Sequence, residues 1–106
     1  MSDWTTVAQV AELPKGKRLL VDLDDTSVLL FNLDGAYYAI ENLCTHDEER
    51  MDEGEVKNGT ITCPHHGAIF CIKTGAALSA PAFEATATFP VQVQDGAIQI
   101  RDPRWD

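Results

Sequence analysis

Two short cysteine–histidine pairs constrain the fold of this chain more than any other feature. The first is Cys44-Thr-His46 and the second is Cys63-Pro-His-His66, with sixteen residues between His46 and Cys63. Each pair offers one soft thiolate and one imidazole, a ligand mixture that suits iron–sulfur chemistry. A shared metal centre would tie the two segments together. Such a staple helps a chain of 106 residues to fold.

The spacing of these pairs resembles that of the Rieske [2Fe–2S] family. The first arm reads C-x-H, and the second reads C-x2-H followed by Gly67. In that family two cysteines bind one iron and two histidines bind the other. The resemblance implies one [2Fe–2S] cluster as cofactor. Its metal ligands would be Cys44 and Cys63 on the first iron, and His46 and His66 on the second.

Histidine ligation raises the reduction potential of such a cluster. Two thiolates neutralise the charge of about +2 on the oxidised core, and imidazoles add none, so potentials span roughly −150 to +300 mV. High-potential relatives carry an additional cysteine in each arm, where this chain has Glu49 and His65. The disulfide of that branch cannot form here. The resemblance therefore implies a low-potential centre.

Other uses of cysteine and histidine fit the pattern less well. Structural zinc sites commonly pair two close cysteines with two histidines, or use two C-x-x-C knuckles. A Cys–His hydrolase needs one activated thiolate and a base from elsewhere, which gives no reason for two matched pairs. A zinc-stabilised interaction module stays open as an alternative.

One histidine and one cysteine are left outside this ligand set. The family spacing places the second-arm ligand at His66, so we expect His65 to be an exposed neighbour of the cluster. Cys71 lies in the apolar run 68–72. That setting predicts a buried, small hydrophobic side chain.

The chain is acidic, with seventeen acidic and eight basic residues and a formal net charge of −9. Such a charge repels nucleic acid and anionic membranes, and it suits steering toward basic patches on redox partners. No run of eighteen apolar residues is present, which predicts no membrane span. The first residues lack the features of a secretory signal, and three cysteines fit a reducing compartment. We expect a cytoplasmic protein.

Short apolar runs separated by turn residues predict an all-β chain with little helix. Aspartate or asparagine precedes glycine at 34–35, 58–59 and 95–96, and such pairs favour hairpin turns. Strands are predicted over residues 18–23, 27–32, 36–40, 60–63, 69–73, 90–94 and 97–100. Both ligand arms would then lie in loops at strand ends, where rigid strands hold them.

The family resemblance makes this fold prediction specific. It implies one Rieske domain over residues 1–106, an antiparallel β-sandwich with a smaller cluster-binding subdomain at about residues 42–81. Pro81 lies where the family has a proline-bearing loop over the cluster, although an ordinary turn would explain it equally well. Asp47 replaces the glycine that many relatives carry after the first histidine.

All three histidines fall in the two arms, which leaves none for the 2-His-1-carboxylate iron site of an oxygenase. The chain therefore resembles a carrier, not an enzyme. It is most similar to the ferredoxin component of bacterial ring-hydroxylating dioxygenase systems, above all over residues 63–75 and 89–93. The resemblance implies a soluble one-electron carrier. It would take electrons from an NAD(P)H-dependent flavin reductase and pass them to a terminal Rieske oxygenase of aromatic hydrocarbon catabolism.

We expect the electron to reside on the histidine-ligated iron and to leave through the outer edges of His46 and His66. Reduction should raise the imidazole pKa values, so the potential should fall as pH rises. The small Rieske-like subunit of an assimilatory nitrite reductase stays open as an alternative. We expect a monomer, although antiparallel edges can pair.

Overall fold

The computed structural model describes residues 4–23, 26–43, 50–64, 67–80 and 84–102. Within these ranges the chain forms antiparallel strands and one short 3-10 helix, η1, which spans Val10–Glu12. The strands are β1 Thr5–Gln9, β2 Arg18–Leu23, β3 Thr26–Leu33, β4 Ala36–Glu41, β5 Glu55–Lys57, β6 Thr60–Thr62, β7 Ile69–Cys71, β8 Thr88–Phe89, β9 Val91–Gln94 and β10 Ala97–Ile100. In this part of the chain no helix has the length and apolar character that crossing a bilayer requires.

The largest sheet has the strand order β2-β3-β4-β8. Its centre is the β3–β4 hairpin, which turns at Asp34 and Gly35 with φ values of 56° and 98°. Two successive positive φ values belong to the tight hairpin turns that match strand twist, and aspartate followed by glycine adopts them readily. The predicted turn is therefore confirmed.

Strand β3 is buried on both of its faces. Leu29 and Phe31 point into one hydrophobic core, while Val28 and Leu30 point into a second core on the opposite face. Side chains alternate across a strand, so an unbroken apolar run is what a strand between two cores requires. Strand β3 therefore contributes to both cores, as does β4 through Ile40 and Ala39.

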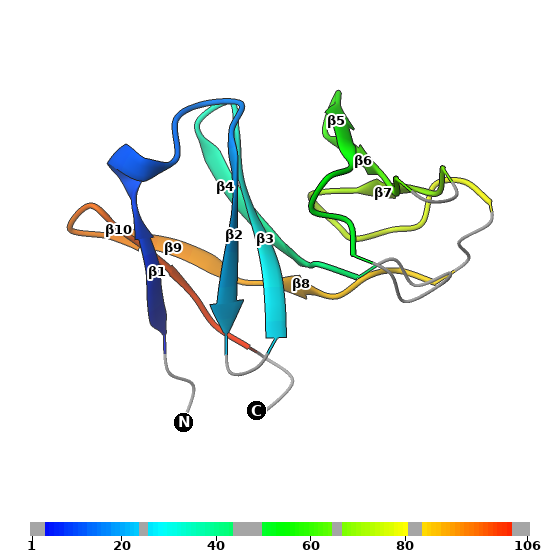
Figure 1. The fold of residues 1–106 in the computed structure, drawn as a ribbon. Coiled ribbons are helices and arrows are strands. Elements are labelled where there is room, and N and C mark those ends of the chain that lie inside the picture. The colour runs from blue at the N-terminus through cyan, green and yellow to red at the C-terminus, as the bar shows by residue number, and fades with distance from the viewer. Residues whose placement is uncertain (1–3, 24–25, 44–49, 65–66, 81–83, 103–106) are drawn as a thin grey trace.

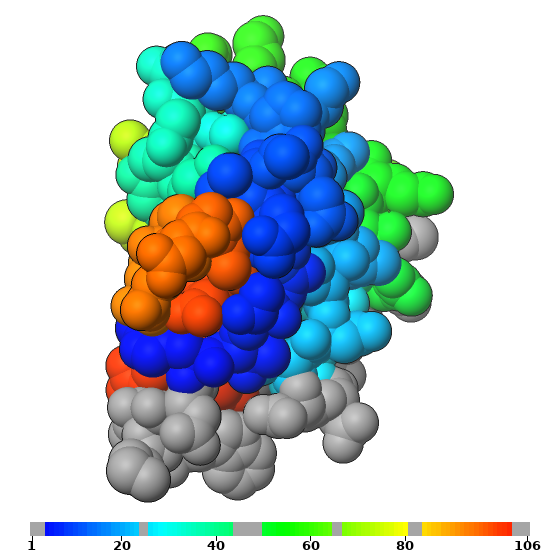
Figure 2. Space-filling model, turned by 90° about the vertical axis from the view of Figure 1, so that its left-hand side faces the viewer, coloured from blue at the N-terminus to red at the C-terminus, as the bar shows by residue number. Residues whose placement is uncertain are grey.

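A second sheet, with the order β1-β10-β9, brings together segments from opposite ends of the described chain. Thr5 pairs with Ile100, and the β9–β10 hairpin turns at Asp95 and Gly96. Figure 2 shows this face, with dark-blue β1 running beside the orange and red β9 and β10. Ile98 and Ile100 are buried in the core that also contains Leu30.

The third sheet, β5-β6-β7, is small and lies to one side of the other two sheets (Figure 1). Its strands have three residues each, and Asn58 and Gly59 form its first turn. Ile61 and Phe70 are fully buried and pack in the same core as Phe31. The small sheet is thus attached to the large sheet through the face of β3 that carries Leu29 and Phe31.

The all-β prediction is confirmed, and each predicted strand overlaps an observed one. Two predicted strands extend too far: β6 ends before Cys63, and β7 ends at Cys71. A third begins too early, because Pro90 separates β8 from β9. Strands β1, β5 and β8 were not predicted. The last two are very short, and all three residues of β5 are exposed, so neither carries an apolar alternation.

Candidate metal centre

Cys63 is the predicted ligand whose surroundings the structure describes. It follows β6 directly and is 1% exposed. Its backbone N–H donates to the carbonyl oxygen of Ala68 at 2.7 Å, and its own carbonyl accepts from the N–H of Gly67 at 3.1 Å. Gly67 has a φ of 75°, which favours glycine at this bend. The second arm is therefore a tight turn closed by hydrogen bonds at its base.

The segment 76–79 braces the far side of this turn. The N–H of Ile69 donates to Oγ of Ser79 at 3.2 Å, and the N–H of Leu78 donates back to the carbonyl of Ile69 at 2.7 Å. Ser79 is thus held beside the strand that leaves the second arm. Pro81, for which a covering loop and an ordinary turn were equally good interpretations, lies outside the described residues.

The first arm begins just after β4. Leu43 donates its N–H to the carbonyl of Glu41 at 2.8 Å, and its own carbonyl accepts a hydrogen bond from Oγ1 of Thr86 at 3.2 Å. These contacts fix the peptide that precedes the first predicted ligand. Other sequence-predicted positions lie outside the described residues, namely Cys44, His46, Asp47, Glu49, His65 and His66.

Thr86 connects the base of the first arm to the turn that follows β7. It is 4% exposed, and its N–H donates to the carbonyl of Gly75 at 2.8 Å while its hydroxyl holds Leu43. Gly75 has a φ of 77°, and a Cβ built on it would lie 2.2 Å from the carbonyl oxygen of Thr86. The chain beyond β7 can approach Thr86 this closely because residue 75 is glycine. The entry to the first arm and the turn beyond β7 are therefore fixed to one residue.

Sequence reasoning did not identify Thr86, nor the buried Asn42 at the start of the first arm. Asn42 could have been noticed, because it lies two residues before a predicted ligand. Thr86 acts on a carbonyl 43 positions earlier in the chain, and no local pattern signals such a contact.

The surroundings of Cys63 fit a cluster ligand. The residue belongs to a core that includes Met51, Ala68 and Phe70, so its sulfur lies in an apolar, water-shielded environment. An apolar shell of this kind controls solvent access to a metal site and helps to set its potential. Within the described ranges, no three Cys, His, Asp or Glu side chains gather as a metal-binding group. Three of the four predicted ligands, Cys44, His46 and His66, lie outside those ranges.

Cys71 differs from its prediction. It is half-buried, because β7 forms an edge of the small sheet, and it lines a cavity of about 460 Å³ together with Lys73 and Asn58. A hydrogen bond with the Thr74 side chain lowers the pKa of Cys71, burial opposes the shift, and the charge of Lys73 adds to it. The prediction of a buried side chain is therefore wrong, because Cys71 is only partly buried at the edge of the sheet.

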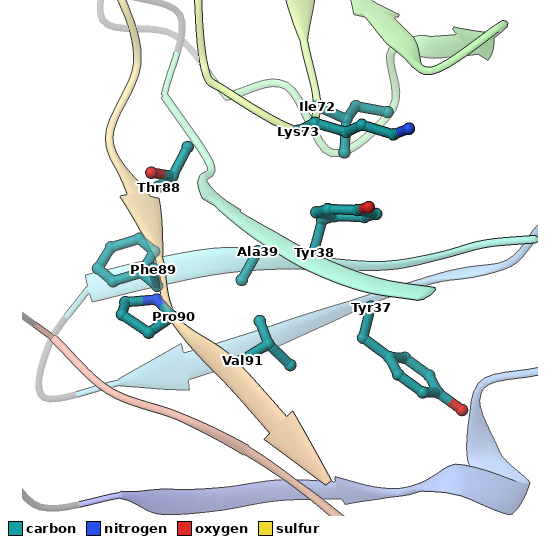
Figure 3. A pocket seen from close by; sticks show the side chains of 9 residues that line it. All are labelled: Tyr37, Tyr38, Ala39, Ile72, Lys73, Thr88, Phe89, Pro90 and Val91. Atoms are coloured by element: carbon teal, nitrogen blue, oxygen red, sulfur yellow. The ribbon is translucent and has the colours of Figure 1, made fainter. Parts of the chain in front are cut away.

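A second cavity, of about 440 Å³, follows the seam between the small sheet and strands β4, β8 and β9. Figure 3 shows the Tyr38 ring lying beneath Lys73, and Nζ of Lys73 is 5.8 Å from the ring centroid. Phe89 and Pro90 form the opposite wall. Aromatic and aliphatic groups dominate this lining, and the Lys73–Tyr38 cation–π contact joins the two sheets across it.

Comparisons with known proteins agree with this arrangement. A family model described as the Rieske [2Fe–2S] domain matches residues 3–90. The 3-phenylpropionate/cinnamic acid dioxygenase ferredoxin subunit of Escherichia coli (strain K12) is 42% identical over 95 residues, which cover 89% of each chain.

Two solved structures share the fold. The ferredoxin of carbazole 1,9a-dioxygenase from Nocardioides aromaticivorans IC177 has a TM-score of 0.86 and 29% identity, over 92% of this chain and 95% of that one. A chain from the complex of reduced oxygenase and oxidized ferredoxin in carbazole 1,9a-dioxygenase has a TM-score of 0.85 and 26% identity, over 92% and 91%. The predicted Rieske fold is thereby confirmed. The chain belongs to the Rieske [2Fe–2S] domain family, among the ferredoxins of dioxygenase systems.

Proposed function

We propose that this protein carries single electrons on a low-potential [2Fe–2S] cluster to the terminal oxygenase of an aromatic-ring dioxygenase system. One observation carries this conclusion: the chain matches dioxygenase ferredoxin subunits along nearly their whole length. A chain that corresponds to the ferredoxin component is an electron-transfer protein and not the catalytic oxygenase. The acidic net charge of −9 suits brief encounters with basic surfaces on redox partners.

The ligand set that we propose is Cys44 and Cys63 on one iron, with His46 and His66 on the other. Its two thiolates and two imidazoles are the donor set of Rieske clusters. Cys63 supports it directly, because it stands on a hydrogen-bonded turn with its sulfur shielded from water. When bound, the cluster supplies reversible one-electron chemistry. Because Cys63 is buried, we assign electron exchange with partners to the side of His46 and His66.

The domain organisation that we propose is one domain over residues 1–106, with a cluster-binding subdomain at about 42–81. The shared hydrophobic core supports one domain, because it joins Phe31 of the large sheet to Ile61 and Phe70 of the small one. The three short strands of the small sheet fall within the proposed subdomain.

The partners that we propose are an NAD(P)H-dependent flavin reductase as donor and a terminal Rieske oxygenase as acceptor. The ferredoxin of a carbazole 1,9a-dioxygenase forms a complex with its oxygenase, which supports an oxygenase as the acceptor. The donor is the one that the resemblance to dioxygenase ferredoxins implies, since a one-electron carrier needs a source of electrons. We further propose that the protein works as a monomer in the cytoplasm and binds neither nucleic acid nor membranes.

The test begins with anaerobically purified protein. We expect about two irons per chain and, after reduction with dithionite, the rhombic EPR signal of a histidine-ligated cluster. One zinc per chain without an EPR signal would contradict the carrier and favour a zinc-stabilised module.

The partners are tested with the same preparation. Affinity capture from cells grown on aromatic compounds should recover a ring-hydroxylating oxygenase, and adding that oxygenase should reoxidise the reduced protein. Recovery of a sirohaem reductase instead would favour the nitrite reductase alternative.

A further inference from the structure

A buried asparagine closes the base of the loop that carries the first ligand arm. Asn42 follows β4 directly and is 4% exposed. Its Oδ1 accepts the N–H of Met51 at 2.7 Å. Its Nδ2 donates to Oδ1 of Asp52 at 3.2 Å and to Oγ of Ser27 at 3.3 Å. One side chain therefore links the point where the chain enters segment 43–50 to the point where it leaves.

Both ends of this segment are fixed to rigid parts of the molecule. At the entrance, the N–H of Asn42 donates to the carbonyl of Ser27, in the first part of β3, at 2.9 Å. At the exit, Met51 is fully buried in the core that contains Cys63, and its carbonyl accepts from the N–H of Gly54 at 2.8 Å. The Asn42 amide bridges these two anchors. The side chain of Asn42 thus joins two anchor points that are themselves fixed to the rest of the molecule.

We propose that Asn42 is a positioning residue for the iron–sulfur cluster: by holding the two ends of segment 43–50 together, it fixes the first ligand arm relative to Cys63. This inference rests on the ligand set proposed above, in which Cys44 and His46 belong to that segment. Groups outside the ligands that fix ligand orientation typically change metal affinity by about 10–100-fold when they are removed. A loop tied at its base also has less conformational freedom to lose when the cluster binds.

The charges around Asn42 strengthen this tie. Asp52 also accepts a hydrogen bond from Nε of Arg50 at 3.1 Å. Burial pushes the pKa of Asp52 upward, but hydrogen bonds from Asn42 and Arg50 outweigh it and hold the pKa below its ordinary value. Asp52 is therefore a carboxylate at neutral pH. A hydrogen bond to a charged acceptor is stronger than one between neutral groups.

Asn32 provides a matched control. It too is 4% exposed, its Nδ2 donates to the carbonyl of Leu13 at 2.8 Å, and its Oδ1 accepts the N–H of Gly35 at 2.8 Å. It thus ties two backbone segments with the same chemistry, but at the opposite end of β3 from Ser27. Asn32→Ala and Asn42→Ala remove equivalent groups, and only the second should affect the cluster.

The experiment compares the wild-type holoprotein with these two variants. Cluster loss is followed by visible absorbance in excess chelator, and the EPR spectrum and midpoint potential of each protein are recorded. We expect Asn42→Ala to lose its cluster at least about 10-fold faster than wild type and to show a changed EPR line shape. We expect Asn32→Ala to keep the wild-type rate and spectrum, although its Tm falls. Equal rates in the two variants would overturn the role of Asn42.

A polarity swap tests the same contact without emptying the site. Asn42→Asp keeps an oxygen acceptor for the N–H of Met51 but places a second carboxylate against Asp52. Adding Asp52→Asn to that variant restores a donor–acceptor pair with the opposite direction. We expect the single variant to lose its cluster faster and the double variant to recover most of the wild-type rate. A double variant no better than the single one would contradict the inference.

The EPR spectrum of the wild-type protein distinguishes a wrong ligand set from a wrong role for Asn42. If wild type lacks the signature of a histidine-ligated cluster, the ligand set fails and the role of Asn42 fails with it. If wild type shows that signature while Asn42→Ala and Asn32→Ala behave alike, the ligand set stands and the positioning role alone is wrong.

Discussion

The large and small sheets are both antiparallel, yet they are stabilised in different ways. Strands β2, β3 and β4 pair over six positions at each interface, whereas β5, β6 and β7 pair over three. Short isolated hairpins are only marginally stable in water. The small sheet, which leads into the Cys63 turn, must therefore gain stability from the rest of the molecule.

Contacts from the large sheet and its neighbours supply that stability. The guanidinium of Arg18 in β2 donates to the carbonyl of Gly54, just before the small sheet. Thr86 holds Gly75 just beyond it, and Phe31 packs against its buried face. The comparison shows that the region nearest the proposed cluster is kept rigid by residues outside it. It also shows which residues can be substituted to test how far the small sheet depends on these contacts.

The largest effect is expected when the proposed ligand itself is removed. Cys63→Ser should abolish cluster binding, because a serine hydroxyl is a poor substitute for a thiolate ligand of iron. Iron content and the reduced EPR signal measure the loss. Far-UV circular dichroism should still report the strands of the two larger sheets. Cys71→Ser is the matched control and should keep its cluster, so full iron occupancy in Cys63→Ser would contradict the assignment.

Substitutions on the two faces of β3 test whether cluster release depends on the small sheet in particular or on the whole domain. Phe31→Ala opens a cavity on the face toward the small sheet, and Leu30→Ala opens one on the opposite face. Each should cost about 2–5 kcal/mol of stability, seen as a lower Tm. Cluster release in chelator should accelerate mainly in Phe31→Ala. Equal acceleration in both variants would mean that the whole domain, and not the small sheet, controls release.

Substitution of two glycines with nearly the same backbone conformation distinguishes the effect of close packing on stability from the effect of backbone strain. Gly75 and Gly96 have φ values of 77° and 79°, but only Gly75 faces atoms that a Cβ would overlap. Gly96→Ala should cost roughly 1 kcal/mol from backbone strain alone. Gly75→Ala should cost about 2–5 kcal/mol, because the chain must also move away from Thr86. Thermal unfolding of the two variants measures the difference, and similar Tm values would contradict the close approach at Gly75.

A smaller effect is expected in the chemistry of Cys71. Iodoacetamide reacts with the thiolate, and the Thr74 hydrogen bond lowers the pKa of Cys71. Alkylation should therefore remain fast at pH values where an ordinary cysteine, with a pKa of about 8.5, is mostly protonated. Thr74→Val should raise the pKa and move the pH profile upward. Peptide mass spectrometry assigns the modified residue, and identical profiles in both proteins would rule out the hydrogen bond as the cause.

The smallest effect should come from the seam between the sheets. Lys73→Met keeps most of the side-chain stem but removes the charge above the Tyr38 ring, at a cost of about 0.5–1 kcal/mol. A double-mutant cycle with Tyr38→Leu isolates this contact from the rest of the seam. A coupling energy of zero would show that the two side chains meet without stabilising each other.

Local sequence signals predicted most of the fold. The bounds predicted for β2 and β10 match the structure, because each is an apolar run that stops at turn residues. The Asp34-Gly35 and Asn58-Gly59 turns were predicted for the same reason. Strand β5 could not be predicted, because its side chains are exposed and it exists by pairing with β6.

The sequence predicts the ligands of the candidate site, but it does not predict the polar residues that support the ligand loops. Cysteine and histidine spacing identified Cys63, and the structure places it on a loop at a strand end as expected. The hydrogen bonds of Asn42 and Thr86 reach residues 9 to 43 positions away in the chain. Local sequence patterns do not indicate contacts between residues so far apart in the chain. The polar residues that hold a metal loop are therefore visible only after folding.

The pairing of β1 with β10 has a consequence for synthesis on the ribosome. Thr5 meets Ile100, so the sheet that contains both cannot close until β10 has emerged. The large sheet likewise needs β8, which follows both ligand arms. Contacts between distant parts of a chain form late and slowly. We therefore expect the iron–sulfur assembly machinery to encounter closed sheets, with cluster insertion following the synthesis of β10.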